Sequence, residues 1–276
     1  MLAREPDLEK VRGLHARYGL EVRKGDVTEA QSLRGTLEDM EAVIHLVGII
    51  SEIGRGTFEN VHTEGTRNMV AATNEQGVKR FVHMSALGTR PNAVSRYHKS
   101  KWAAEETVRS SGLDWTIFRP SLIYGPGDQF VNLFAKIIRW SPVVPVMGRR
   151  DARFQPVAVE NVAEAFVKAV QEPRAFTKTF DLCGTERLTL IEIIDQIMSV
   201  MGKRRLKAQV PTLVARIQAG FLEFLFPRVL RKAPPLNRDQ LIMLEEDNVG
   251  DEQAAKQLFG LAPAPLRERI RYLREE

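Results

Sequence analysis

The chain has 276 residues, of which 43% are hydrophobic and 27% are charged, and it contains a single cysteine. This balance is typical of a globular protein and excludes disordered, collagen-like and disulfide-rich classes. The net charge of +5 is spread along the chain without a basic block rich in aromatics, so the sequence does not indicate nucleic-acid binding. The chain has no apolar run of the length that crosses a bilayer and no signal-peptide pattern, and one cysteine suits a reducing compartment. We therefore expect a cytoplasmic protein.

Short, apolar, β-branched runs alternate with helical patterns through the first half of the chain. We expect strands at Glu21–Lys24, Ala42–Val47, Arg80–Met84 and Trp115–Phe118, and helices at Asp7–Tyr18, Thr28–Glu38, Phe58–Gln76 and Arg96–Ser111. The middle strands are almost continuously hydrophobic, which is typical of strands buried on both faces. The alternation predicts repeated βαβ units, and therefore an α/β doubly wound fold with a Rossmann-type parallel sheet.

The pattern changes after the turn-rich segment Gly125–Asp128. The second half is expected to contain helices at Phe130–Trp140, Val162–Gln171 and Leu190–Met201, and strands at Val143–Val146, Phe154–Val159 and Thr179–Leu182. We interpret residues 1–124 as an incomplete dinucleotide-binding domain to which elements at about 154–182 return. Residues 125–276 would then form a smaller mixed lobe with a helical tail.

A phosphate-binding loop is missing from the sequence. None of the 19 glycines falls into G-x-G-x-x-G, G-x-x-G-x-x-G or the P-loop pattern, which place backbone N–H groups around a pyrophosphate. In a dinucleotide-binding sheet this loop follows the first, central strand. We therefore expect the sheet to lack its first strand. We hypothesise that Met1 is an internal methionine preceded by roughly 25–35 further residues, about one βα unit.

The most informative motif is Tyr97-His98-Lys99-Ser100-Lys101, preceded by Ser85 at the end of a buried strand. A tyrosine and a lysine four residues apart share one helix face. The ammonium group favours the phenolate and lowers the high pKa of the tyrosine, while a serine hydroxyl can orient a carbonyl oxygen. The arrangement suits proton transfer coupled to hydride transfer.

With these motifs the chain resembles the short-chain dehydrogenase/reductase superfamily, in its extended or atypical branch. Five segments match in order: Gly25–Thr28, His45–Gly48, Met84–Gly88 with Tyr97 and Lys101, Arg119–Gly127, and Phe154–Ala163. Within the superfamily the chain is most similar to the branch that contains the nucleotide-binding accessory subunit of respiratory complex I and its bacterial relatives. That likeness rests on Val82–Gly88, Ser95–His98 and Leu113–Pro120.

The resemblance implies a nucleotide-binding site and indicates which residues would form it. Cofactor contacts are expected from Arg4, Asp26, Val27, Leu46, Val47, Gly48, Tyr97, Lys101, Pro120, Ser121, Leu122 and Ile123, and catalytic roles from Tyr97, Lys101 and Ser85. Arg4 lies where the family meets the adenosine 2′-phosphate, so NADP(H) is expected rather than NAD(H). Asp26 either contacts the adenine or caps the helix that follows. Ser85 and Tyr97 are closer in sequence than in catalytic extended members, which puts catalysis in doubt.

Two further features concern metal binding and membrane binding. His45 and His83 lie in apolar strands and Cys183 has no partner at metal spacing, so they are interpreted as core residues and no metal is expected. The apolar segment 211–232 is bounded by basic residues, which is typical of a helix lying on a membrane surface or against a membrane complex. A helix packed on the protein's own lobe would show the same pattern.

Three functions remain open on the sequence alone. The first is an NAD(P)(H)-binding accessory protein, docked at a respiratory membrane complex on the inner face of the membrane. The second is an NAD(P)-dependent oxidoreductase or sugar-nucleotide epimerase/dehydratase that uses Tyr97 and Lys101. The third is a truncated scaffold that binds no cofactor.

Overall fold

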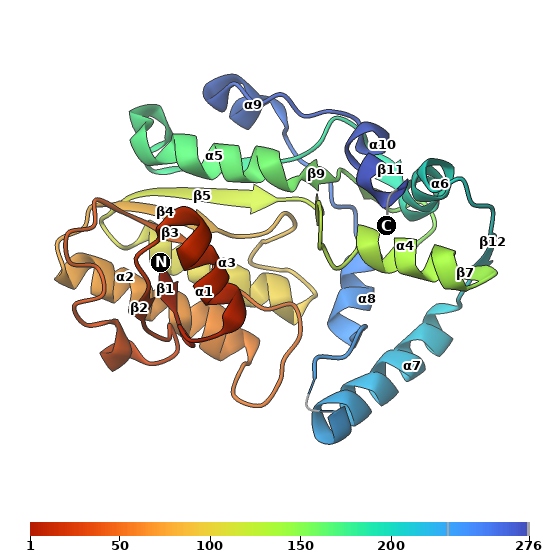
Figure 1. Ribbon diagram of the computed structural model, residues 1–276, viewed down its shortest axis with the longest axis horizontal. Coiled ribbons are helices and arrows are strands. Elements are labelled where there is room, and N and C mark those ends of the chain that lie inside the picture. Colours follow the sequence, from red (N-terminus) through yellow and green to blue (C-terminus); the bar gives the residue numbers. More distant parts are fainter. Residues whose placement is uncertain (231, 275–276) are drawn as a thin grey trace.

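The computed structural model describes residues 1–230 and 232–274, and its centre is a parallel sheet (Figure 1). Four strands lie in the order β10 (Lys178–Leu182), β5 (Asp114–Pro120), β4 (Arg80–Met84) and β3 (Ala42–His45). Every neighbouring pair is parallel. The doubly wound α/β fold is confirmed.

Beyond β3, the described part of the chain supplies no further strand to the four-stranded sheet. The pair β1 (Leu2–Ala3) and β2 (Arg23–Lys24) forms a separate parallel ladder, and among the described residues no ladder joins it to β3. Leu2 nevertheless packs against the core cluster that contains Val43 of β3. The two sheets therefore share one core, while the outer edge of β3 has no neighbouring strand.

Helices cover both faces of the four-stranded sheet (Figure 1). On one face, Val43, Phe81 and Ile117 pack with α2 (Gly65–Glu75) and α3 (Arg96–Arg109). On the other face, Val82 and Phe118 pack against α5 (Val159–Gln171) and α9 (Gln253–Phe259). Consecutive strand residues point to opposite faces, which explains why these strands are apolar at nearly every position.

A second core lies beyond the carboxyl ends of the strands. Its buried residues come mainly from α4 (Val131–Trp140), β7 (Val143–Val146), α6 (Leu190–Val200) and α10 (Leu266–Arg269). Three small ladders complete this part: β6 (Ile123–Tyr124) with β9 (Val157–Ala158), β8 (Arg153–Phe154) with β11 (Leu188–Thr189), and β7 with β12 (Leu206–Gln209). A capping box on Thr189 and Glu192 starts α6.

Two predicted elements are wrong in detail. The helix expected at Thr28–Glu38 is only a short 3-10 turn, η1 (Ala30–Leu33), because Arg34 is extended and Gly35 has φ of 69°. The strand expected at Phe154–Val159 is interrupted by Pro156, which has no N–H for a ladder. The helix expected at Phe58–Gln76 is present, but its first part is a π-helical segment, η2 (Glu59–Glu64).

The remaining helices lie outside the sheet. Near the N-terminus, α1 (Glu9–Tyr18) connects β1 to β2. In the apolar segment, α7 (Thr212–Leu225) continues into η4 (Phe226–Leu230), and α8 (Arg238–Leu244) packs against α7. Short 3-10 turns lie at η3 (Pro173–Ala175) and η5 (Arg271–Arg274). Among the described residues no helix combines the length and apolar character needed to cross a bilayer.

Candidate functional site

The helix α3 carries Lys101 to the carboxyl ends of β3 and β4. Ser95 caps the start of α3 by accepting a hydrogen bond from the backbone N–H of His98. The Lys101 ammonium donates to the carbonyl oxygen of Met84 at 3.0 Å. Gly48, just after β3, lies so close that a Cβ there would be 3.1 Å from Lys101 Nζ. Open α/β sheets bind their ligands at this edge.

His62 on η2 completes the surroundings of Lys101. Its Nε2 accepts from the backbone N–H of Ile49 at 2.9 Å, so its Nδ1 carries the hydrogen that faces Ser100 Oγ at 2.8 Å. Ser100 in turn donates to the carbonyl oxygen of Tyr97. The Tyr97 ring makes edge contacts with His62 and with Phe58. The network holds His62 neutral and fixes the start of α3.

Burial shifts the pKa values of this cluster. Burial lowers the pKa of Lys101 to about 8. The pKa of His62 is lowered to about 3, first by burial and then by the charge of Lys101. Burial raises the pKa of Tyr97 to about 12. In this arrangement the phenol keeps its proton at neutral pH, although Tyr97 and Lys101 share one helix face as the sequence predicted.

Ser85 is hydrogen-bonded within the protein. Its hydroxyl donates to the carboxylate of Glu105, which is fully buried and also pairs with Arg109 and Arg119. Ser85 itself is only 4% exposed. The one hydroxyl proton of Ser85 is therefore used within the protein, and among the described residues no hydrogen bond joins Ser85 to Tyr97.

The residues expected near the adenosine lie around the ends of the two small strands. Asp26 Oδ1 accepts from the backbone N–H and the hydroxyl of Thr28, as a local cap would. Val27 is buried in the core next to Gly65. Arg4 is exposed and has one loose ion pair, 3.8 Å from Glu5. The guanidinium of Arg4 is therefore free to meet a phosphate.

The other expected contacts come from the ends of β3 and β5. Leu46 and Val47, which follow the edge strand β3, are exposed, with 55% and 42% of their surface accessible. At the end of β5, Pro120 and Ser121 are buried, and Leu122 and Ile123 are partly buried. The hydroxyl of Ser121 hydrogen-bonds to Asn248, which ties this segment to the C-terminal region.

These residues fit a nicotinamide dinucleotide in part. Gly48 leaves room beside the Lys101 ammonium, a donor suited to ribose hydroxyls, and Arg4 offers a cation at the far end. The residues present include no glycine-rich turn for the pyrophosphate, and the exposed Leu46 and Val47 border the place where that turn would lie. Lys101 and Arg4 are therefore candidate contacts for the two ends of a dinucleotide, and the sequence shows no glycine-rich turn between them.

The histidines and the cysteine form no metal site. The described residues include no group of three His, Cys, Asp or Glu side chains that could hold a metal ion. His45 contacts Thr66 and stacks on His83, whose two ring nitrogens have no partner among the described residues. Burial raises the pKa of Cys183 to about 12, which disfavours the thiolate form that binds metals.

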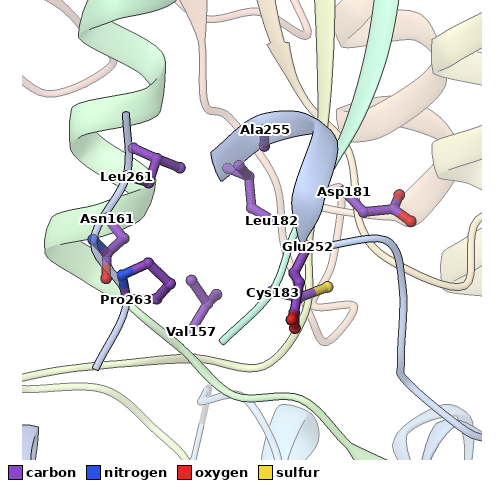
Figure 2. A pocket seen from close by; sticks show the side chains of 9 residues that line it. All are labelled: Val157, Asn161, Asp181, Leu182, Cys183, Glu252, Ala255, Leu261 and Pro263. Atoms are coloured by element: carbon purple, nitrogen blue, oxygen red, sulfur yellow. The ribbon is translucent and has the colours of Figure 1, made fainter. Parts of the chain in front are cut away.

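Figure 2 shows the small cavity that Cys183 lines, together with Asp181, Glu252 and Asn161. Its volume of about 10 Å³ is that of a single water molecule and cannot hold a nucleotide. The candidate site is therefore the strand edge beside Lys101.

Two residues of the site were missed by the sequence analysis. Glu105 follows Lys101 by four residues and Tyr97 by eight, so the i, i+4 spacing that singled out the first pair could also have identified Glu105. His62 had no such signal, because its position depends on the π-helical segment, a feature often found at functional sites.

Comparison with known proteins agrees with this geometry. A family model described as NAD(P)H-binding matches residues 1–173. The chain belongs to this NAD(P)H-binding family. Its relatives include the mouse mitochondrial NADH dehydrogenase [ubiquinone] 1 alpha subcomplex subunit 9, which is 32% identical over 191 residues, or 68% of this chain and 50% of the mouse protein. The ceramide reductase of Caulobacter vibrioides is 34% identical over 177 residues, or 64% of this chain and 51% of that protein.

A solved structure supports the fold of this family member. An NADPH-dependent quinone oxidoreductase from Escherichia coli, QOR2, superposes with a TM-score of 0.77 at 19% identity, over 99% of this chain and 89% of that one. The likeness to an NAD(P)H-binding family and to the complex I accessory subunit, inferred from the motifs, is thus confirmed. The chain spans about half the length of the mouse relative.

Proposed function

We propose that this member of the NAD(P)H-binding family binds NADP(H) as an accessory protein of a respiratory membrane complex, on the inner face of the membrane, and does not turn over a substrate. The observation that carries the proposal is the pairing of Ser85 with Glu105. A serine hydroxyl held by a buried carboxylate cannot orient a substrate carbonyl, while Lys101 remains at the strand edge where a ribose binds.

Three further observations support the accessory role. The raised pKa of Tyr97 keeps its phenol protonated at neutral pH. The mouse relative is named as a subunit of an NADH dehydrogenase complex. The free guanidinium of Arg4 suits the 2′-phosphate that distinguishes NADP(H) from NAD(H).

Titration of the protein with NADPH and NADH, followed by nicotinamide fluorescence, tests the proposal. We expect NADPH to bind more tightly, Arg4→Gln to remove the preference, and Lys101→Met to weaken both nucleotides about tenfold, the effect of one charge-assisted hydrogen bond. Lys99→Met is the matched control, because Lys99 is exposed on the same helix. If neither nucleotide binds, the scaffold that binds no cofactor takes the place of this proposal.

The second candidate is an active NAD(P)-dependent oxidoreductase or sugar-nucleotide epimerase/dehydratase. The shared helix face of Tyr97 and Lys101 favours it, and one relative is named a ceramide reductase. A bound nicotinamide would supply or accept the hydride, and Tyr97 would move the proton. In a screen of NADPH oxidation with quinone, ketone and sugar-nucleotide substrates, turnover that Tyr97→Phe abolishes would establish this candidate and overturn the accessory role.

A further inference from the structure

The helix α7 turns its large apolar side chains to solvent. Leu213, Ile217, Phe221 and Phe224 recur every three or four residues along one side of α7 and are 60% to 71% exposed. On the opposite side the small residues Ala215 and Ala219 pack with Leu241 of α8. Figure 1 shows α7 extending away from the rest of the protein. A stripe of this length is far more apolar surface than isolated exposed residues provide.

The segment around α7 also concentrates positive charge. Between residues 203 and 238 the sequence has nine lysines and arginines and one acidic residue, Glu223, so this segment carries a net charge of +8 in a chain whose total is +5. The remainder of the protein is therefore net negative, at −3. The apolar stripe and the basic excess belong to the same part of the molecule.

A basic hollow lies just before α7. It has a volume of about 620 Å³ and is lined by Lys203, Arg204, Arg205 and Lys207. Lys207 pairs with Asp195 and Arg205 donates to a backbone carbonyl. For the side chains of Lys203 and Arg204, the described part of the chain provides no hydrogen bond or ion pair. Two cations in this hollow are thus free to bind an anion.

Further exposed apolar residues lie beside the hollow. Leu206, between Arg205 and Lys207, is 73% exposed and pairs in register with Val143, and Trp140 at the end of α4 is 79% exposed. Tryptophan beside basic residues is typical of the boundary between water and lipid, where the ring takes up an amphipathic position. Basic side chains and exposed apolar side chains therefore occur together around the hollow, as they do around α7.

We propose that α7 and the basic hollow dock this protein directly on a bilayer that contains anionic phospholipid. The stripe from Leu213 to Phe224 lies in the interface, and Lys203 and Arg204 bind headgroup phosphates. The charge selects this partner, because a bilayer rich in anionic phospholipid presents a broad negative surface that matches a segment with one acidic and nine basic residues. The inference does not depend on nucleotide binding.

Sedimentation of the purified chain with vesicles tests the inference. One set of vesicles is phosphatidylcholine alone, and the other contains roughly 30% phosphatidylglycerol, an anionic lipid. We expect binding at least about tenfold tighter to the anionic vesicles, with most of it lost in high salt because screening weakens the attraction to the headgroups. Equal binding to both sets, or binding to neither, would overturn the proposal.

Two variants and a control separate the contributions. Ile217→Gln with Phe221→Gln should weaken binding more than tenfold, and Lys203→Gln with Arg204→Gln about fivefold per charge removed. Val167→Gln, an equally exposed apolar position on α5, should bind as the unaltered protein does. Thermal melting checks that each variant folds. If Ile217→Gln with Phe221→Gln instead breaks a dimer seen by light scattering and leaves vesicle binding intact, α7 binds a second copy and the proposal is wrong.

Discussion

The hydroxyl of Ser85, just after β4, donates to the carboxylate of Glu105, a fully buried side chain of α3. The same carboxylate accepts from two guanidinium groups, those of Arg109 and Arg119, and Arg109 lies one helical turn after Glu105. The carboxylate of Glu105 therefore links Arg109 of α3, Arg119 of β5 and Ser85. Ser85 is the serine that a reductase would need to orient its substrate. The network stabilises the fold at the position where catalytic relatives would work.

Removing the charge of Glu105 should therefore destabilise the protein strongly. Glu105→Gln leaves Arg119 beside a neutral amide in a largely buried site, and breaking a buried pair in this way costs about 3–5 kcal/mol. Urea unfolding followed by circular dichroism measures the loss. Glu106→Gln is the matched control, because Glu106 pairs with the same Arg109 but is exposed, and a change within about 0.5 kcal/mol is expected. Equal losses of unfolding free energy in both variants would show that the buried network contributes no more to stability than the exposed pair.

His83 should be replaceable with a gain in stability. Its side chain is 1% exposed on β4, and among the described residues neither ring nitrogen has a hydrogen-bond partner. Because an unpaired buried polar group costs about 1–3 kcal/mol, His83→Phe should stabilise the protein by an amount of that order. The ring would keep its stacking on His45 and Phe81. A lower unfolding midpoint in urea would indicate that a water or ligand satisfies His83.

The free energy of unfolding should decrease on mild acidification because His45 and His62 are buried. Burial lowers the pKa of both His45 and His62 to about 3, whereas an unfolded histidine titrates near 6.5. Between these values the unfolded chain binds more protons, so the free energy of unfolding decreases as the pH falls. From pH 7.5 to 5.5 each histidine contributes a loss of about 1.4 kcal/mol. His62→Gln should remove that amount from the difference between the free energies of unfolding measured in urea at pH 7.5 and pH 5.5.

The parts of the fold that the sequence predicted well are those decided by local pattern. The strand Arg80–Met84 was placed correctly because a β-branched, apolar run between a glycine and polar residues has few other structures. The expected helix at Thr28–Glu38 failed because Arg34 is extended and Gly35 has a positive φ, a backbone path to which a contact from β2 is fitted. Arg23 from β2 donates to the backbone oxygens of Gly35, Thr36 and Glu38, a long-range contact that no window of sequence reveals.

The candidate site, like the fold, has features that local sequence predicts and features that depend on tertiary contacts. Tyr97 and Lys101 were found because i, i+4 spacing on a helix is a local property. The partner of Ser85 depends on how α3 packs against β4 and β5, and that packing also decides whether Ser85 can serve a substrate. The local motif therefore indicates a candidate site at Tyr97 and Lys101, whereas the hydrogen-bond partner of Ser85 depends on the tertiary contacts of Glu105.

Among the described residues, the outer edge of β3 has no neighbouring strand. Ile44 pairs in register with Val82, which α5 covers completely, yet Ile44 is 40% exposed. An unpaired edge and a bare apolar face are what a neighbouring strand and its helix would cover. Supplying one strand–glycine turn–helix unit from a family relative, fused before Met1, should raise the melting temperature by several degrees, about the effect of 1 kcal/mol or more in a domain of this size. The amides of β3 should become protected from hydrogen exchange at the same time. Fusing the same unit with its strand residues replaced by Gly and Ser is the control. If neither fusion protects β3, the edge is not a site for strand addition.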